Sequence, residues 1–343
     1  MTEKATRELW VDDVKVIACA FVVLGHFFQS MTKANILNDG GFLTWFNTAI
    51  YTFHVPLFFI CSGYLYNKYS HIQSFSDYGK NVSKKALDLG IPYFTFSLIT
   101  WALKTVFADS VNDKAGGLLN TLFLNPISPY WFLYCLFIMF LITPTFSKKS
   151  YVTVLLCISF ALKTASIFYG NFEIGIISQF MKNYLWFVAG MLIALMNTRT
   201  YFKNKRVLPV SIATLIVFLI SSIAICVFEL DNGFIKLIIG IFACFGIISL
   251  TGYVTANGKQ SPLFAFMGKY TMPIFLMHTI FCAPIRSILI KLSIFNPAIH
   301  VILGIAVSFA GPILAAVIMH KLKYPEFFIY PRKTLKNIKE SNN

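Results

Sequence analysis

Charged residues are scarce in this chain, and most of them are basic. Only 13% of the 343 residues are charged, 14 Asp or Glu against 29 Lys or Arg, while 57% are hydrophobic and the mean hydropathy is +0.69. A soluble domain needs more polar surface than this composition can supply. The scarcity of charge therefore excludes a single soluble core and predicts a membrane protein with most of its length in the bilayer.

Three other features are missing from the sequence. All seven cysteines lie in apolar segments without the paired spacing of a zinc, haem or redox-dithiol site. The basic residues are spread over short loops and helix ends instead of forming a basic domain, so nucleic acid is not an expected partner. The first ten residues, MTEKATRELW, lack an apolar run with a small-residue cleavage site. We therefore expect the first helix to stay in the protein.

Apolar runs long enough to cross a bilayer recur from end to end. They predict an all-α, polytopic integral membrane protein with about ten transmembrane helices, near residues 12–31, 42–66, 86–108, 129–146, 151–168, 175–196, 207–229, 234–253, 264–290 and 298–320. Lysines and arginines concentrate in alternate loops, so the positive-inside rule predicts that both termini are cytoplasmic. Residues 1–320 then form a single transmembrane domain, and residues 321–343 form a basic cytoplasmic tail that we expect to contact anionic membrane lipids.

The first predicted helix contains ionisable residues, which are costly in a membrane helix unless they are paired or used. Lys15 and His26 are eleven positions apart, which returns them to nearly the same helix face, about 16 Å apart along the axis. Asp12 lies on that face, where it can pair with Lys15 or orient it. A cation at the inner mouth and a deeper imidazole suit a ligand with an anionic head and a long reactive arm. The alternatives are that Lys15 extends to the interface and that His26 bonds a neighbouring helix.

Two further histidines lie in predicted helices at a similar depth. His54 lies two residues before Pro56, whose missing N–H predicts a kink that opens backbone carbonyls towards a cavity. His278 lies near the middle of its predicted helix. Three histidines at one depth indicate a proton-handling site, and satisfied core histidines are the alternative. Because no HxH or HExxH spacing and no neighbouring carboxylate accompanies them, we expect no metal.

Four ordered motifs make the chain resemble the acyltransferase 3 family of bacterial multi-helix membrane proteins. The stretch DDVKVIACAFVVLGH contains the opening motif of that family, which is a basic residue, ten others and a histidine. The branch of fucose 4-O-acetylase-like exopolysaccharide acetyltransferases is similar to FHVPLFFICSGYLY at 53–66, WFLYCLFIMFLITP at 131–144 and GKYTMPIFLMHTIF at 268–281. The resemblance runs from about Trp10 to the last helix.

This resemblance implies an O-acyltransferase of the bacterial cytoplasmic membrane. It would move an acyl group, most simply acetyl, from cytoplasmic acetyl-CoA to a hydroxyl of an extracytoplasmic or lipid-linked glycan, alongside polysaccharide-biosynthesis proteins. His26 matches the essential histidine of the family, and we expect a general base there, with His54 or His278 orienting it or polarising the thioester carbonyl. An acyl-histidine intermediate is the open alternative. Lys15 matches a position that is usually arginine, and lysine lacks the planar fork that binds phosphate in two places.

The loop after the second helix departs from the family pattern. Relatives often have two basic residues three apart before a proline there, whereas SKKALDLGIPYF keeps Lys85 and has Asp88 at the other place. A carboxylate at that place would repel a phosphate. We therefore expect Lys80, Lys84 and Lys85, with Lys15, to contact the phosphates of CoA.

Candidate contacts for the acceptor lie elsewhere in the chain. Trp131 and Tyr134 share a helix face at a spacing of three, where they can stack on a sugar ring or simply pack. Glu173, near the expected outer surface, is a third candidate. A proton-coupled transporter or flippase is the alternative function, in which the histidines would relay protons and the basic mouth would attract an anionic substrate.

Overall fold

The computed structural model describes residues 7–70, 72–109 and 111–341, and every regular element in this part of the chain is helical. The longer helices are α1 (Leu9–Lys33), α3 (His54–Tyr69), α5 (Ile91–Val106), α7 (Lys149–Tyr169), α8 (Gly175–Ala194), α10 (Val207–Val227), α11 (Gly233–Thr255), α12 (Pro262–Lys291) and α13 (Pro297–Leu322). The shorter ones are α2 (Phe42–Ile50), α4 (Phe75–Lys85), α6 (Trp131–Ile142), α9 (Thr198–Lys203) and α14 (Pro331–Ser341). Two π-helical segments, η1 (Ala86–Gly90) and η2 (Asn120–Leu124), and the 3-10 segment η3 (Tyr324–Phe328) complete the chain.

Nine segments among the described residues are long and apolar enough to cross a membrane. They coincide with nine of the predicted spans, which confirms the polytopic all-α membrane class; α2 with α3, and α4 with α5, each make one segment. The remaining prediction, residues 129–146, contains only α6, a helix of 12 residues. At about 18 Å this helix is shorter than the apolar thickness of a bilayer. Irregular backbone precedes it, and that backbone becomes part of the site.

The helix predicted over residues 42–66 is interrupted by a turn at 51–53, between α2 and α3. Pro56 therefore lies in the first turn of α3, where a helix has no N–H bond to lose. The predicted kink at Pro56 is wrong in position, because the chain bends before His54 and the proline helps to start the next helix.

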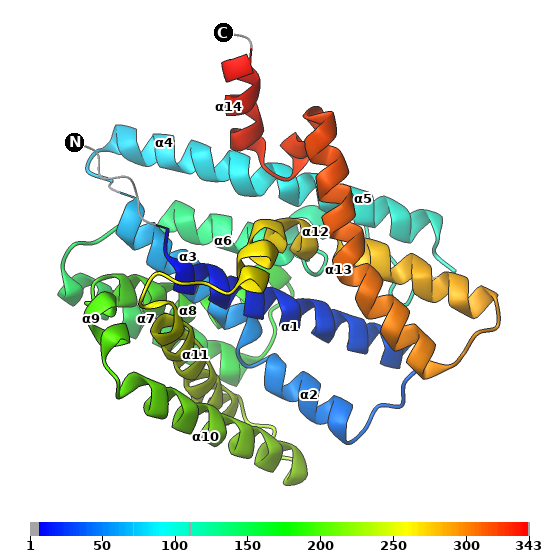
Figure 1. The fold of residues 1–343 in the computed structure, drawn as a ribbon, viewed down its shortest axis with the longest axis horizontal. Coiled ribbons are helices and arrows are strands. Elements are labelled where there is room, and N and C mark those ends of the chain that lie inside the picture. Colours follow the sequence, from blue (N-terminus) through cyan, green and yellow to red (C-terminus); the bar gives the residue numbers. More distant parts are fainter. Residues whose placement is uncertain (1–6, 71, 110, 342–343) are drawn as a thin grey trace.

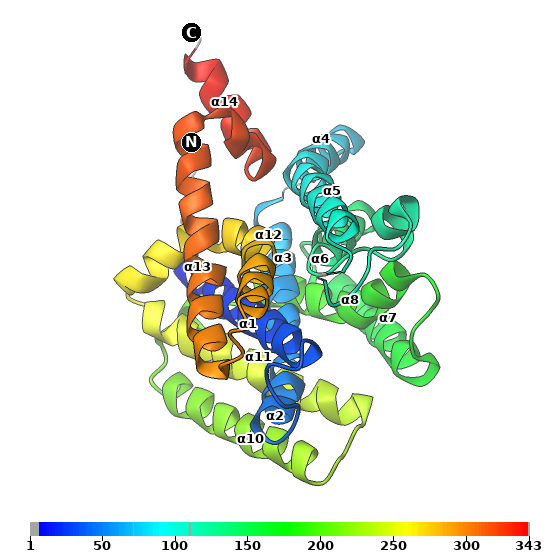
Figure 2. The ribbon, with the colours of Figure 1, turned by 90° about the vertical axis from the view of Figure 1, so that its right-hand side faces the viewer.

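The first helix, α1, lies in the middle of the bundle and packs against α3, α11 and α12 (Figures 1 and 2). Behind it, α3 packs closely on α8 because each helix offers a glycine to the other. A Cβ atom on Gly63 would lie 1.9 Å from Phe187 O, and one on Gly190 would lie 2.0 Å from Ile60 O. Only glycine permits two backbones to approach so closely. This tight pair holds the start of α3, which carries His54, in place beside α1.

Both ends of the described chain lie on the same side of the bundle. At the start of α1, Glu8 accepts a hydrogen bond from Lys68 Nζ of α3 at 2.5 Å. After α13, Arg332 of α14 donates its Nε to Asp88 Oδ2 of η1 at 2.7 Å. The neighbouring Lys85 is close enough to interact electrostatically with Arg332 and with the second turn of α1. That both termini are cytoplasmic stays a prediction.

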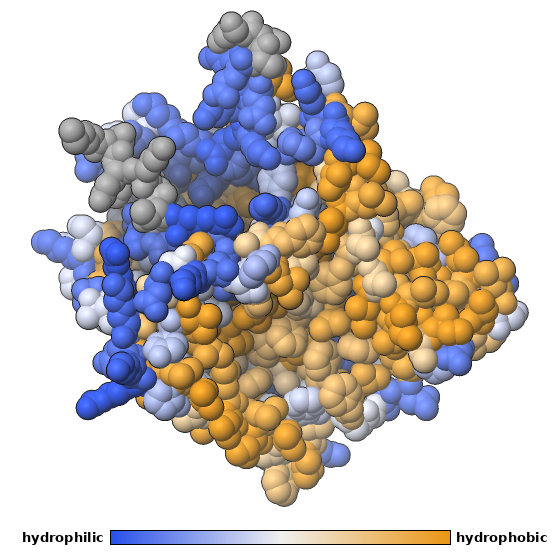
Figure 3. All heavy atoms as spheres, in the orientation of Figure 1, coloured by the Kyte–Doolittle hydropathy of each residue, from blue (hydrophilic) through white to orange (hydrophobic). Residues whose placement is uncertain are grey.

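The surface divides into an apolar part and a polar part. Figure 3 shows hydrophobic residues over the lower and right-hand regions, and hydrophilic residues around α4, α9 and α14 at the left and top. The exposed apolar side chains include Ile216 and Ile220 of α10 and Ile302 and Leu314 of α13. A continuous apolar surface of this kind faces lipid.

Candidate active site

The half-buried imidazole of His26 lines a cavity of about 810 Å³ between α1, α3, α5, α12 and the segment before α6. His26 lies in the fifth turn of α1, which is a continuous helix through both Lys15 and His26. The cavity is large enough for a sugar-sized ligand. The predicted histidine therefore borders a cavity instead of packing only against hydrocarbon.

The other two candidate histidines converge on His26. The ring centroids of His26 and His278 lie 5.4 Å apart, and His54 lines the same cavity beside Tyr51. His54 and His278 are 2% and 1% exposed. The sequence predicted only a shared depth, and the packing of α1, α3 and α12 brings the three rings to one place.

Backbone carbonyls fix the tautomers of the two buried histidines. His54 Nδ1 lies 2.5 Å from Ile50 O, and His278 Nδ1 lies 3.0 Å from the carbonyl oxygens of Ile274 and Phe275. A carbonyl oxygen can only accept, so each Nδ1 carries the proton and each Nε2 is left as an acceptor. His278 Nε2 is buried with no hydrogen-bond partner among the described residues. An unused proton acceptor therefore lies beside the His26 ring.

Ser128 is a site residue that the sequence analysis missed. Its Oγ lies 3.4 Å from His26 Nε2, and residues 126–129 line the cavity. The prediction of a membrane helix from residue 129 hid this irregular segment. Non-helical backbone at membrane depth is tolerated where it borders a cavity, and the prolines on both sides of Ile127 and Ser128 are the signal that could have identified it.

Tyr130 fastens this irregular segment to the helices around it. Its hydroxyl donates to Leu276 O of α12 at 2.9 Å and shares a 2.9 Å hydrogen bond with Thr100 Oγ1 of α5. Tyr130 is fully buried, and Thr100 lines the cavity. The wall that carries Ser128 is thereby held at a fixed distance from α12.

The candidate acceptor contacts separate into one inside the cavity and two outside it. Trp131 lines the cavity together with Phe58, Phe132 and Phe275. Tyr134 instead stacks on Tyr93, with ring centroids 5.3 Å apart. Glu173 is exposed in the loop before α8 and is absent from the cavity wall. The structure therefore leaves Trp131 as the sugar-stacking candidate and removes Tyr134 and Glu173, because packing on Tyr93 and the loop position take them away from His26.

The lysine end of α1 differs from the expected pairing. Asp12 accepts from Arg7 Nε at 2.5 Å, so the expected Asp12–Lys15 pair is wrong. Asp13, the buried neighbour, accepts from Gln260 Nε2 at 2.6 Å. No hydrogen-bond or ion-pair partner of Lys15 occurs among the described residues, and Lys15 is half-buried. Its ammonium group is therefore available for an anionic ligand.

The three loop lysines occupy different environments. Lys80 and Lys84 are exposed on α4, whereas Lys85 is half-buried with its Nζ 4.3 Å from the ring centroid of Phe140. Lys85 is close enough to Lys15 for the two charges to interact. The expected cluster of lysines therefore reduces to Lys15 and Lys85, because α4 carries the other two along its solvent side.

Asp88 does not present a free negative charge beside these lysines. It accepts from Arg332 Nε at 2.7 Å and also from Arg332 Nη2, and this hydrogen bond raises the pKa of the guanidinium. The C-terminal helix thus places an arginine against this carboxylate, at the place where relatives were expected to have a second basic residue, and the pair has no net charge. The expected repulsion of a phosphate by Asp88 is corrected, since Arg332 neutralises the carboxylate. The tail is also docked on the bundle, because Tyr330 OH donates to Lys269 O at 3.1 Å.

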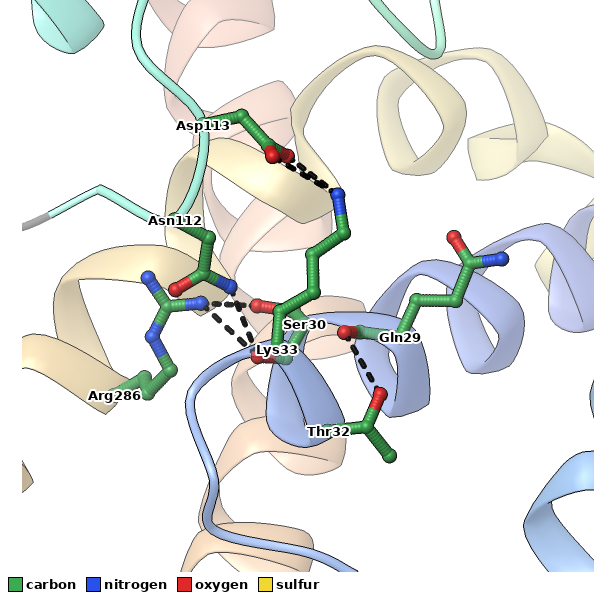
Figure 4. A network of polar contacts seen from close by, with 7 residues as sticks. All are labelled: Gln29, Ser30, Thr32, Lys33, Asn112, Asp113 and Arg286. Carbon is green, nitrogen blue, oxygen red and sulfur yellow. Dashed lines mark hydrogen bonds and ion pairs between the residues drawn. The ribbon is translucent and has the colours of Figure 1, made fainter. Parts of the chain in front are cut away.

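The cavity at His26 does not extend to Lys15. Its wall contains the Lys33 end of α1, and between Lys15 and His26 the helix is packed through the buried Cys19 and Val23. The Lys33 end adds Gln29, Ser30 and Arg286, which the sequence analysis also did not single out (Figure 4). No group of three His, Cys, Asp or Glu that could hold a metal ion occurs among the described residues.

With this geometry in hand, comparison with known proteins gives a clear family. A family model described as "Acyltransferase domain", of the acyltransferase 3 family, matches residues 8–317. The chain belongs to the acyltransferase 3 family. This membrane acyltransferase contains its three histidines, Lys15 and Ser128 within the matched region.

Two curated relatives of this acyltransferase bear the name "Nodulation protein NolL". The one from Mesorhizobium japonicum (strain LMG 29417 / CECT 9101 / MAFF 303099) is 30% identical over 147 residues, which cover 42% of this chain and 38% of the relative. The one from Sinorhizobium fredii (strain NBRC 101917 / NGR234) is 32% identical over 141 residues, which cover 41% of this chain and 37% of the relative. The chain thus spans under two fifths of the length of these relatives. No solved structure matches the acyltransferase.

Proposed function

We propose that this acyltransferase moves an acetyl group from cytoplasmic acetyl-CoA to a hydroxyl of an extracytoplasmic or lipid-linked glycan, in the bacterial cytoplasmic membrane. The observation that carries the proposal is that His26 and His54 line one cavity within the bundle, while the ring of His278 lies beside that of His26. A transfer to a hydroxyl needs a base at the reacting oxygen and polar groups that stabilise the developing charge. His26 offers the base, whereas His54 and His278 present acceptor nitrogens and so cannot polarise the thioester carbonyl as the sequence analysis expected.

In the proposed step His26 Nε2 takes the proton of the acceptor hydroxyl. The hydroxyl oxygen forms a C–O bond to the thioester carbonyl carbon, and the C–S bond breaks. The thiolate leaves with the proton that His26 returns, which gives free CoA and an O-acetyl ester. Ser128 Oγ, 3.4 Å from His26 Nε2, holds the imidazole towards the cavity.

The two buried histidines have distinct supporting roles in this proposal. His278 Nε2, an acceptor without a partner among the described residues, can receive an N–H from His26 and so orient the ring. His54 keeps its proton on Nδ1 towards Ile50 O, so its Nε2 acts only as an acceptor in the cavity wall. An acyl group carried on His26 is the alternative route through the same residues.

The donor side of the proposal uses the cations near the start of α1. Lys15 and Lys85 are close enough there for their charges to interact, and phosphates of CoA would bind such a pair of cations. Since the cavity stops short of Lys15, the acyl arm of the donor must displace side chains along α1 to reach His26. The donor path is therefore formed on binding.

The test is release of free CoA by the purified protein in detergent, given acetyl-CoA and a glycan acceptor. We expect CoA release that depends on the acceptor, and a loss of about 10²- to 10⁴-fold in His26→Ala, the usual contribution of a general base. His320→Gln is the matched control, because His320 is in the last turn of α13 and outside the cavity wall. Unchanged turnover in His26→Ala would contradict the assignment. Glycan uptake into vesicles without CoA release would favour the transporter.

A further inference from the structure

The end of the cavity away from Lys15 carries an excess of positive charge. Four cationic side chains and one carboxylate line it, namely Lys33, Lys104, Arg286, Lys291 and Asp113. Three uncompensated cations are unfavourable in a site for a wholly neutral sugar, because their mutual repulsion and desolvation cost free energy that such a ligand cannot offset. The charge of this end therefore indicates an anionic ligand.

Arg286 is the member of this group that is buried, with only 4% of its surface exposed. Its Nη1 donates to Ser30 Oγ and lies 3.4 Å from Ser30 O (Figure 4). No hydrogen-bond partner of its Nε or Nη2 occurs among the described residues, and Arg286 lines the cavity. A buried guanidinium with two unpaired nitrogen atoms in a cavity wall is suited to a carboxylate or a phosphate.

The single carboxylate of this end is already engaged. Asp113 accepts from Lys33 Nζ at 2.7 Å and 3.0 Å, in an ion pair whose two side chains are 58% and 53% exposed. Towards Arg286 it contributes only electrostatic attraction across the network (Figure 4). Its neighbour Asn112 donates to Ser30 O at 3.0 Å and so helps to hold the serine that orients Arg286.

The helix register sets the distance between this cation and the proposed base. Arg286 bonds Ser30, which lies four residues after His26 on α1. One turn of helix separates the two positions, about 6 Å along the axis. That separation is comparable with the width of one sugar ring. If one hydroxyl of a sugar lies at His26, the opposite side of the same ring therefore lies at Arg286.

We propose that the acceptor is an anionic glycan, whose carboxylate or phosphate binds Arg286 while a nearby hydroxyl of the same sugar lies at His26. This inference rests on the proposed function, because it assigns the acceptor of that reaction. Lys104 and the exposed Lys291 also line this end of the cavity, and their charges attract the same anion. The two sources of the anion are an acidic sugar and the phosphate of a lipid or other phosphate linkage.

The test compares three acceptors built on one oligosaccharide: the neutral form, a form with a uronate carboxylate and a form with a phosphate at the reducing end. In the unmodified protein we expect the acceptor KM of one anionic form to be about 10- to 100-fold below that of the neutral form, as for a charge-assisted hydrogen bond. The anionic form with the lower KM identifies the source of the anion. Arg286→Gln should abolish the preference and leave the KM of acetyl-CoA unchanged, whereas Arg286→Lys should retain part of it.

Lys114→Gln is the control, since Lys114 is exposed in the loop of Asp113 but absent from the cavity wall. It should keep the full preference. Equal KM values for all three acceptors, or a preference that survives Arg286→Gln, would overturn the inference while CoA release still supports the proposed function.

Calorimetric binding of inorganic phosphate and of glucuronate without acetyl-CoA separates the two proposals further. Binding that Arg286→Gln removes supports the anion site even if no transfer occurs, and equal binding by both proteins contradicts it.

Discussion

The two ends of α1 both present cations, but in opposite settings. At the start of the helix, Lys15 has no partner among the described residues and no cavity opens beside it. At the far end, Lys33 is paired with Asp113 and belongs to the wall of a cavity of about 810 Å³. Under the proposed function, this difference means a preformed acceptor side and a donor side that opens along the helix before an acyl group reaches His26.

The largest effect is expected from filling the preformed end. Ala283 lies in the cavity wall on α12, and Ala283→Trp would place a large side chain where the acceptor is expected. We predict that acceptor-dependent CoA release falls by about 100-fold, as when a reactant is kept from its position. Acetyl-CoA binding should remain within about twofold, because the donor enters from the other end. A similar loss of both properties would remove the distinction between the ends.

Lys15→Gln tests the donor end by itself. Removal of one charge-assisted contact to a phosphate should raise the KM of acetyl-CoA about tenfold, while the KM of the acceptor is unchanged. Lys259→Gln is the control, since Lys259 is an exposed lysine next to Gln260, the residue that binds Asp13 at the same end. A rise in the acceptor KM of Lys15→Gln, with an unaltered donor KM, would reverse the proposed polarity of the site.

A smaller effect is expected from a change beside His26, which lies between the proposed donor and acceptor ends of the site. Ser128→Ala removes one hydrogen bond at 3.4 Å from His26 Nε2. A net loss of about 1 kcal/mol corresponds to roughly a fivefold fall in kcat, with both KM values unchanged. A change confined to KM would show that Ser128 binds substrate instead of orienting the imidazole.

The smallest effect concerns pH and the docked tail at the donor end. Burial raises the pKa of Glu326, but hydrogen bonds from His320 and Lys333 outweigh it and hold the pKa below its ordinary value. A carboxylate with a lowered pKa contributes stability above its ordinary pKa and loses it as the pH falls through the folded value. Protection of α14 against hydrogen exchange, corrected for the intrinsic rate, should therefore not fall between pH 8 and pH 5. A loss of protection over that range would contradict this pairing.

Much of the fold could be predicted from the sequence because lipid imposes long apolar helices. Hydrophobicity located nine spans, and helix geometry placed Lys15 and His26 on one helix with the expected register. The break before His54 was not predicted, because Pro56 suggested a kink at its own position. The irregular segment at Ser128 was not predicted either. The apolar run around it resembles a helix, and a helix is the structure expected at membrane depth.

The polar partners were the least predictable part of the site. Asp12 pairs with Arg7, which lies before the membrane span, and Asp88 pairs with Arg332, more than two hundred residues later. Sequence spacing identifies neighbours on one helix, but it carries no information on which distant segment docks there. For the same reason, the sequence could not assign Arg286 to the site, because the contact depends on α12 packing against Ser30 of α1.

The measurement that most directly tests an acyl group passing along α1 is transfer across a sealed membrane. The protein is reconstituted in one orientation into vesicles, with acetyl-CoA on one side and the glycan acceptor on the other. We predict O-acetylated glycan when acetyl-CoA is on the side of Lys15 and the acceptor is on the side of Lys33, and none when the two are exchanged. Product in the exchanged arrangement, or only when both substrates share one side, would contradict the account.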